Sequence, residues 1–316
     1  MSKKKLLIAG IGGIGGFFGG LLAKDYYDSN DVDIFFLARG RNLLKIKESG
    51  LRINENDLEL VIKPNLVSDK VSDFGIVDYI LMCTKTYDLE ETLIQLLPSI
   101  NDNTIIIPLQ NGVDSHDKIA KQLPKNSIAK GCVYLVSRLE EPGLIIKNGN
   151  IHSLFFGMDN GGNEKLQWLQ DAFLNANIKS VVSEDINKIT WEKFIFLASI
   201  ATATAYFDSN IGGILNSKEK YNMLINLINE VTDLAISKQI NIDKNQQKVV
   251  LEKLKSLPSD ATTSMHSDFR NRKNKTELES LTGYVVAEGK QNRINIETFN
   301  NMYKVLKKAP NELYNT

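Results

Sequence analysis

The first half of the chain alternates short apolar runs with segments of helical periodicity. Four runs have no polar face: Lys5–Ala9, Asp33–Leu37, Tyr79–Cys83 and Thr104–Leu109. Strands that are apolar on both faces are typical of a parallel sheet that helices cover on both sides. The pattern therefore predicts such a sheet in the first half of the chain.

Other segments of the first half predict strands of a different kind. Residues 51–64 alternate apolar and polar positions around a turn signal at Asn54–Asp57, which predicts a hairpin. A second hairpin is expected within Gly143–Gly157, and a late edge strand is expected over Ile178–Ser183.

The pattern changes near Ser183–Asp185. Residues 186–208 are apolar nearly all round, which predicts a buried helix, and residues 217–240 and 276–290 predict further helices. We therefore expect an α/β domain over residues 1–183, of the Rossmann type, followed by an all-α domain over residues 184–316.

Composition and charge narrow the range of functions. The 316 residues are enough for two domains, and 38 basic residues balance 38 acidic ones. A neutral chain argues against nucleic acid as the main partner. No apolar run approaches the ~20 residues that cross a membrane, and the first apolar run ends too soon for a signal peptide. Cys83 and Cys132 have no disulfide or metal spacing, so we expect a reduced, cytoplasmic compartment and no metal.

A glycine-rich stretch follows the first predicted strand. Residues 9–20 hold seven of the 21 glycines and contain the pattern G-x-G-x-x-G at the expected start of a helix. Such glycines permit a tight turn, a close approach of a pyrophosphate and close packing of the helix on the sheet. A flexible turn is the alternative, but the position between strand and helix favours dinucleotide binding. The expected cofactor-binding residues here are Gly10, Gly12, Gly13, Ile14 and Gly15.

The end of the second predicted strand indicates which dinucleotide binds. NAD sites place Asp or Glu there to hold the ribose hydroxyls. This chain has Arg39 and Arg41 instead. An arginine suits a 2′-phosphate, so we expect NADP, although two solvated loop arginines remain an alternative.

Several polar residues follow the later strands or begin the buried helix. They are Lys85, Gln110-Asn111-Gly112 and Trp191-Glu192-Lys193. Each alone is uninformative, because strand-end lysines are usually solvated and Asn-Gly is a common turn. In this order, and with Ser264-Met265 and Thr276-Glu277, the chain resembles the ketopantoate reductases (2-dehydropantoate 2-reductases) from Lys5 to about Gly289. These enzymes are NADPH-dependent reductases of a small 2-oxo acid.

The resemblance implies a role for each matched residue. Lys193 would be the general acid that protonates the developing alkoxide, and Glu277 would close the catalytic cleft between the domains. Asn111 would contact the nicotinamide ribose or the substrate, Lys85 would contact the cofactor and the catalytic cleft, and Gln110 would contact the cofactor. Ser264 would bind the substrate carboxylate. A homodimer is the implied assembly.

Two of these assignments have structural alternatives. Lys193 could extend from a buried helix to solvent without a chemical role. Thr276-x-x-Glu279 fits a capping box, which would make Glu277 an ordinary carboxylate of a first helical turn. His116, His152 and His266 fit no metal or relay spacing, so no role is expected for them.

The chain departs from the family at two substrate positions. Leu197 and Ala201 stand four and eight residues after Lys193, where the family usually has asparagines. Because residues at these spacings share a helix face, the substrate would meet mostly apolar surface there. We therefore expect a more apolar oxo acid, ketone or imine as an alternative to ketopantoate, unless Asn210 and Ser264 supply the missing contacts. A non-catalytic NADPH-binding protein is the other alternative.

Overall fold

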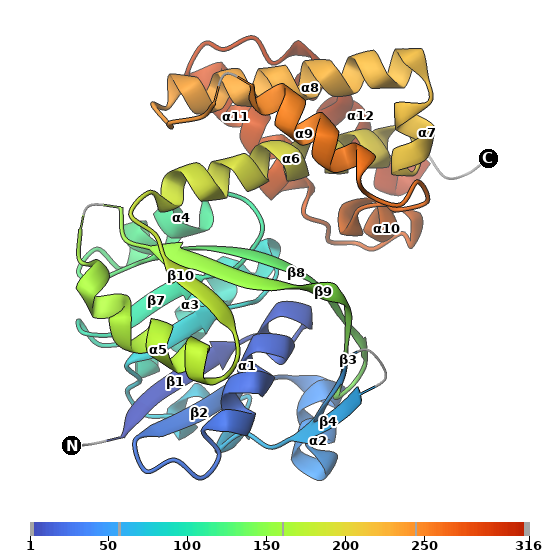
Figure 1. Cartoon of the computed structure of the whole chain (residues 1–316). Helices are drawn as coiled ribbons and strands as arrows, with labels where there is room; N and C mark the ends of the chain where they lie inside the picture. The colour runs from blue at the N-terminus through green and yellow to red at the C-terminus, as the bar shows by residue number, and fades with distance from the viewer. Residues whose placement is uncertain (1–2, 56–57, 160, 244, 313–316) are drawn as a thin grey trace. The chain divides into compact units, whose positions relative to one another are not determined.

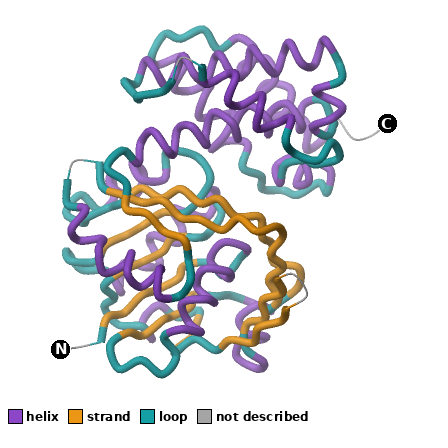
Figure 2. Tube along the Cα trace, viewed as in Figure 1, coloured by secondary structure: helices purple, strands orange, loops and turns teal. Residues whose placement is uncertain are grey.

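The chain forms two compact units (Figure 1). The computed structural model describes residues 3–55, 58–159, 161–243 and 245–312. The first unit comprises Met1–Gln110 and Ser115–Ile186, and the second comprises Asn111–Asp114 and Asn187–Thr316. Every strand of the described residues lies in the first unit, and the second is helical (Figure 2). The predicted order of an α/β domain before an all-α domain is confirmed.

The main sheet of the first unit has five parallel strands. Their order is β5-β2-β1-β6-β7. The strands are β1 (Lys4–Ala9), β2 (Val32–Leu37), β5 (Leu66–Ser68), β6 (Tyr79–Met82) and β7 (Ile105–Pro108). The four predicted strands are confirmed. The three-residue edge strand β5 was not predicted, because it is too short to show a pattern.

Both faces of this sheet are buried, as the apolar runs predict. Leu6 and Ile8 of β1 belong to the core that includes helices α1 (Gly13–Asp25) and α2 (Gly40–Ser49). Leu7 and Ala9 belong to a separate core on the opposite face. Helices α3 (Leu89–Leu96) and α4 (Ser115–Gln122) contribute to that second core. Alternate residues of one strand therefore fill two different cores.

A second sheet accompanies the first. Its order is β10-β9-β3-β4, with β8 paired to β9. The strands are β3 (Leu51–Glu55), β4 (Leu58–Ile62), β8 (Lys130–Glu141), β9 (Leu144–Gly157) and β10 (Lys179–Val182). The hairpin predicted over residues 51–64 is β3–β4, although residues 56 and 57 of its turn lie outside the described residues. The predicted late strand is β10.

The hairpin predicted within Gly143–Gly157 is wrong. That segment is the single strand β9, and its hairpin partner is β8. The sequence Asn148-Gly149-Asn150 resembles a turn, but it forms an irregularity in the pairing, which shifts from Leu135↔His152 to Val136↔Asn148. Extra residues opposite a continuous strand make a bulge, and the positive φ of Gly149 (+71°) is a conformation used in both bulges and hairpin turns.

The glycines of α1 allow this helix to pack closely between the two sheets. A Cβ on Gly19 would lie 2.9 Å from a side-chain carbon of Ile8 in the main sheet. A Cβ on Gly16 would lie 2.6 Å from Ile145 of the second sheet. Larger side chains would force both sheets away from the helix. The cost of glycine within this helix is thus offset by close packing on both sides.

The second unit is built around the buried helix α6 (Ile186–Tyr206). Its other helices are α7 (Ile211–Leu215), α8 (Lys218–Ser237), α9 (Gln246–Lys255), α10 (Ser264–Arg270), α11 (Tyr284–Gln291) and α12 (Glu297–Glu312). A π-helical turn, η5 (Glu279–Gly283), precedes α11, so the helix predicted over residues 276–290 is not regular. Among the described helices, none has the length and apolar character needed to cross a bilayer.

Candidate functional site

The turn between β1 and α1 accepts only glycine at three of the predicted positions, namely Gly10, Gly13 and Gly15. Gly10 has φ +99°, and a Cβ there would lie 2.8 Å from the backbone nitrogen of Thr84. A Cβ on Gly15 would overlap the carbonyl oxygen of Gly10. By contrast, a Cβ on Gly12 would meet no atom within 4 Å. Protein atoms therefore pack closely against the turn at Gly10 and Gly15, whereas the space beside Gly12 is unoccupied by protein atoms.

The N-terminus of α1 is suited to an anion. Gly12 is the N-cap residue, makes no side-chain cap, and the first turn contains no acidic residue. Gly13 packs against the carbonyl oxygen of Ser137, and Ile14 follows it. The first N–H groups of a helix lack intrahelical partners and carry the positive end of the dipole. Together with the open face at Gly12, they fit a dinucleotide pyrophosphate.

Arg39 lies two residues beyond the end of β2 and is the N-cap residue of α2. Its side chain is 47% exposed and its guanidinium lies 3.5 Å from the carboxylate of Glu91. It also donates a hydrogen bond of 3.5 Å to the hydroxyl of Thr92. Arg41 is exposed in the first turn of α2. The guanidinium is therefore available to a ligand, although Glu91 competes for it.

Gln110 and Lys85 lie beyond the ends of β7 and β6 in the same unit. Lys85 is exposed and precedes the short helix η2 (Thr86–Asp88). Gln110 is 8% exposed, and its Nε2 donates to Thr84 Oγ1 at 3.2 Å. No described group hydrogen-bonds to its Oε1. A buried, unsatisfied acceptor costs about 1–3 kcal/mol, so a ligand donor would be favourable there.

The second unit brings three predicted residues together. The Nζ of Lys193, in α6, donates to Asn111 Oδ1 at 3.2 Å. The Nδ2 of Asn111 donates to Glu277 Oε2 at 3.4 Å. Both ends of one amide are therefore bonded to opposite charges, and a flipped amide would place like against like. Glu277 is only 2% exposed, so it is not the solvated first-turn carboxylate of the capping-box alternative.

The backbone around this chain of residues is held from several sides. Gly112 has φ +101°, which directs the chain sharply after Asn111. The π-helical turn η5 follows Glu277, and the Oγ of Ser280 donates to the Glu277 carbonyl. In addition, the buried hydroxyls of Thr202 in α6 and Thr282 in η5 lie 2.7 Å apart. Single π-turns are frequent at functional sites, since they redirect one side chain within a helix.

The face of α6 that carries Lys193 is mostly sealed. Leu197 is partly buried, whereas Ile200, Ala201 and Thr204 have almost no exposed surface and lie in the helical core. The face predicted to be apolar is apolar, and Leu197 is its accessible member. Whether substrate contacts Leu197 and Ala201 stays a prediction.

Ser264 and Asn210 lie at helix starts in the same unit. Ser264 is the exposed first residue of α10, next to the N-cap Thr263. The hydroxyl of Thr263 lies 2.9 Å from that of Thr204, which connects this helix start to α6. Asn210 caps α7, and its side chain accepts from the backbone N–H of Gly213 at 2.8 Å. A structural role for Asn210 is thereby established.

His266 has a structural role that the sequence did not reveal. It is 3% exposed, and its Nε2 lies 2.7 Å from Asp208 Oδ1. Its Nδ1 lies 2.5 Å from the hydroxyl of Thr262. Asp208 is 58 residues away in the sequence, so no local spacing could have indicated this network.

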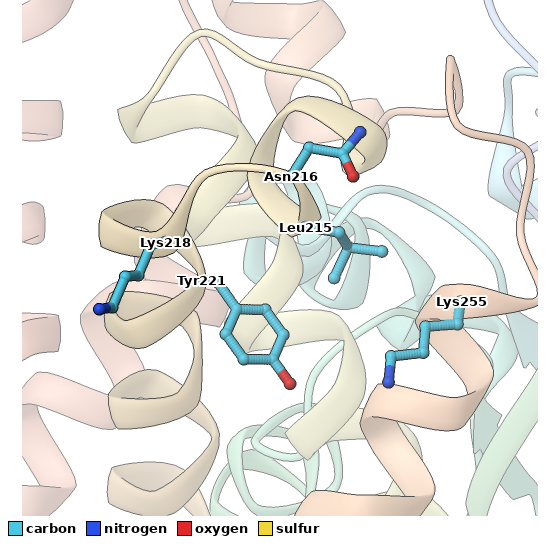
Figure 3. A pocket seen from close by; sticks show the side chains of 5 residues that line it. All are labelled: Leu215, Asn216, Lys218, Tyr221 and Lys255. Carbon is cyan, nitrogen blue, oxygen red and sulfur yellow. The ribbon is translucent and has the colours of Figure 1, made fainter.

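A surface pocket of about 400 Å³ also lies in the second unit (Figure 3). It is lined by Leu215, Asn216, Lys218, Tyr221 and Lys255. The hydroxyl of Tyr221 and the amine of Lys255 point toward one another across it. Lys193, Asn111 and Glu277 do not line this pocket, so the pocket is a separate feature.

Two family models match the chain. The model described as Ketopantoate reductase PanE/ApbA matches residues 6–161, and Ketopantoate reductase PanE/ApbA C terminal matches residues 185–309. The chain belongs to the ketopantoate reductase family. It is therefore an oxidoreductase of a family whose enzymes bind a dinucleotide and reduce small oxo acids.

Known relatives agree with this family. The chain is 27% identical over 288 residues to the Bacillus subtilis protein named uncharacterized oxidoreductase YkpB, covering 91% of this chain and 92% of the relative. It is 25% identical over 293 residues to 2-dehydropantoate 2-reductase of Lactococcus lactis, covering 91% and 92%.

Solved structures share the fold. The 2-dehydropantoate 2-reductase from Porphyromonas gingivalis has a TM-score of 0.85 and 31% identity, with 96% of this chain and 99% of that chain covered. A D-mandelate dehydrogenase bound to NADH and anilino(oxo)acetate has a TM-score of 0.85 at 22% identity, covering 97% and 98%. A 2-dehydropantoate 2-reductase and a D-mandelate dehydrogenase thus share this fold.

Proposed function

We propose that the protein is an NADPH-dependent reductase of a small 2-oxo acid, with Lys193 as the general acid. The observation that carries this proposal is the series of hydrogen bonds from Lys193 to Asn111 and from Asn111 to the buried Glu277. It holds one amine in a defined direction inside a helical unit. A lysine that only reached solvent would not need such an arrangement.

The reaction requires a hydride and a proton. NADPH, which the turn at Gly10–Gly15 and Arg39 would hold, would supply the hydride to the carbonyl carbon of the 2-oxo acid. The ammonium of Lys193 donates its proton to the carbonyl oxygen, which yields a 2-hydroxy acid, and the amine regains a proton from water. A positioned proton donor contributes about 10²–10⁴-fold, and its charge stabilises the developing alkoxide before transfer.

Asn111 and Glu277 position this proton donor. The Asn111 oxygen faces Lys193, so it directs the ammonium without removing its charge. The Glu277 carboxylate fixes the amide from the other side. Loss of either partner would leave the amine free to sample other rotamers, which costs orientation rather than folding.

Arg39 supports the assignment of NADPH. It lies where an NAD site would have a carboxylate, and its guanidinium is partly exposed. A similar fold binds NADH in the D-mandelate dehydrogenase structure, so the fold by itself does not select the cofactor. The residue after β2 is the basis for the choice.

A more apolar substrate than ketopantoate is the second candidate. Leu197 lies one helical turn beyond Lys193 and is the accessible apolar residue of that face. The hydroxyl of ketopantoate would find no hydrogen-bonding partner on Leu197, whereas a branched 2-oxo acid without the hydroxyl would lose nothing. Ser264 would then bind the carboxylate that both substrates share.

The decisive experiment is NADPH oxidation with a panel of 2-oxo acids, ketones and imines. Oxidation with at least one 2-oxo acid is expected. Oxidation only with ketones or imines would overturn the 2-oxo acid assignment and keep the reductase. Tight NADPH binding with no turnover would instead favour a non-catalytic binding protein.

A further inference from the structure

Gln110 carries an unused hydrogen-bonding group beside the glycine turn. Its side chain is more than nine-tenths buried, and within the described residues nothing bonds to its Oε1. The other end of the same amide is occupied, because Nε2 donates to Thr84 Oγ1. Burial without a partner is unfavourable for a carboxamide oxygen, so this group points to a donor that arrives with a ligand.

Thr84 connects Gln110 to the turn itself. A Cβ on Gly10 would lie 2.8 Å from the Thr84 backbone nitrogen and 2.9 Å from its methyl carbon. Thr84 is therefore in direct packing with the turn that follows β1. Its hydroxyl accepts a hydrogen bond from the amide nitrogen of Gln110, while the amide oxygen has no partner among the described residues.

The strand order places Gln110 with one half of the dinucleotide. In the sheet, β2 lies on one side of β1, and β6 and β7 lie on the other. Arg39 lies beyond β2, which assigns that side to the adenosine 2′-phosphate. A dinucleotide extends across the sheet at the carboxyl ends of the strands, with its pyrophosphate at the β1 turn. The nicotinamide half therefore extends toward β6 and β7, where Thr84 and Gln110 lie.

The chemistry of the oxygen agrees with this half. A carboxamide oxygen only accepts hydrogen bonds, so it does not bind phosphate, which at neutral pH is chiefly an acceptor. The nicotinamide half offers donors in its ribose hydroxyls and its carboxamide NH₂. We propose that Gln110 Oε1 accepts a hydrogen bond from the nicotinamide half of the bound dinucleotide, and that Thr84 is the positioning residue that directs it. This inference rests on the proposed function.

Binding to separate halves of the cofactor tests the proposal. The ligands are NADPH, reduced nicotinamide mononucleotide and adenosine 2′,5′-bisphosphate, with Kd measured by calorimetry on the full chain. Gln110→Met keeps the length of the side chain and removes the amide. It is expected to weaken NADPH and the mononucleotide about three- to tenfold, the effect of one hydrogen bond, and to leave the bisphosphate unchanged.

Variants of Thr84 test the positioning role. Thr84→Val keeps the shape but loses the hydroxyl, so the amide can rotate, and NADPH is expected to bind about two- to fivefold more weakly. Thr84→Ser retains the hydroxyl and is expected to restore the parent affinity, which a role in packing alone would not do. Gln122→Met, at an exposed position at the end of α4, is the matched control.

The outcomes separate this proposal from the proposed function. If Gln110→Met binds NADPH like the parent while Arg39→Ala does not, the proposal is overturned and the function stands. An equal loss for the bisphosphate would overturn the assignment to the nicotinamide half. If the parent chain binds neither NADPH nor NADH, the proposed function fails first. If Gln110→Met does not fold, the Thr84→Val and Thr84→Ser pair decides: equal affinities overturn the proposal.

Discussion

The glycine turn of the first unit and the hydrogen-bonded residues Lys193, Asn111 and Glu277 of the second unit are built in opposite ways. The turn comes from neighbouring residues, Gly10 to Gly15, and it works by what is absent, namely side chains. In the second unit, hydrogen bonds join Lys193 to Asn111, which is 82 positions earlier, and Asn111 to Glu277, which is 166 positions later. The first construction excludes atoms so that a phosphate can approach, and the second holds one atom in place.

This difference predicts two classes of variant. Changes around the turn alter cofactor affinity and leave the chemical step intact. Changes at Lys193 lower turnover and leave the affinity for the cofactor intact. A variant that mixed the two effects would contradict the division of labour.

The largest effect is expected from Lys193→Ala. Loss of the proton donor should lower kcat about 10²–10⁴-fold while the Kd of NADPH stays unchanged. Steady-state rates and cofactor fluorescence measure the two quantities. Lys248→Ala, at an exposed position in α9, is the control and should behave like the parent. Parent-like turnover of Lys193→Ala would exclude its role as general acid.

Arg39→Ala should give the reverse result. Loss of a charged hydrogen bond costs about 1.5–3 kcal/mol, so NADPH should bind roughly ten- to a hundredfold more weakly. The affinity for NADH should barely change, and kcat at saturating NADPH should also stay close to the parent value. Direct titration with both cofactors measures this. An equal loss for both would remove the assignment of Arg39 to the 2′-phosphate.

Local features of the fold could be predicted from the sequence, whereas contacts between distant residues could not. The strands of the main sheet and the turn at Gly10 are local features, in which apolar runs and glycines report directly on burial and backbone. The grouping of Lys193, Asn111 and Glu277 could be predicted only from the resemblance to a family, because no sequence spacing connects Asn111 with Glu277. Nor could the sequence show that residues 111–114 belong to the second unit.

Other features depend on tertiary pairing. The Asn148–Asn150 segment has the composition of a turn, but β8 pairs along both sides of it and makes it a bulge. The contact of His266 with Asp208 follows from how α10 packs, whereas its other partner, Thr262, lies only four residues before it. In each case the missing information is which distant segment lies opposite.

Substrate choice tests the helical unit further. Ketopantoate and a branched 2-oxo acid of similar size differ in one hydroxyl, and an unpaired buried hydroxyl costs about 1–3 kcal/mol. The branched acid is therefore expected to have a kcat/KM about tenfold higher or more. Leu197→Asn should reduce or reverse this preference, with NADPH affinity unchanged. A tenfold preference for ketopantoate in the parent would show that other groups, such as Ser264, supply the contact.

Glu91→Gln should have the smallest effect, and it acts in the cofactor unit. The Glu91 carboxylate lies 3.5 Å from the Arg39 guanidinium, and the two side chains are 60% and 47% exposed. Such exposed pairs contribute about 0–1 kcal/mol, so removing the competing charge should tighten NADPH about two- to fivefold. NADH lacks the 2′-phosphate and should show no gain. Glu90→Gln changes the net charge equally at an exposed neighbouring position and is the matched control. The same tightening in Glu90→Gln would indicate a general charge effect, whereas a gain confined to Glu91→Gln would locate the 2′-phosphate at Arg39.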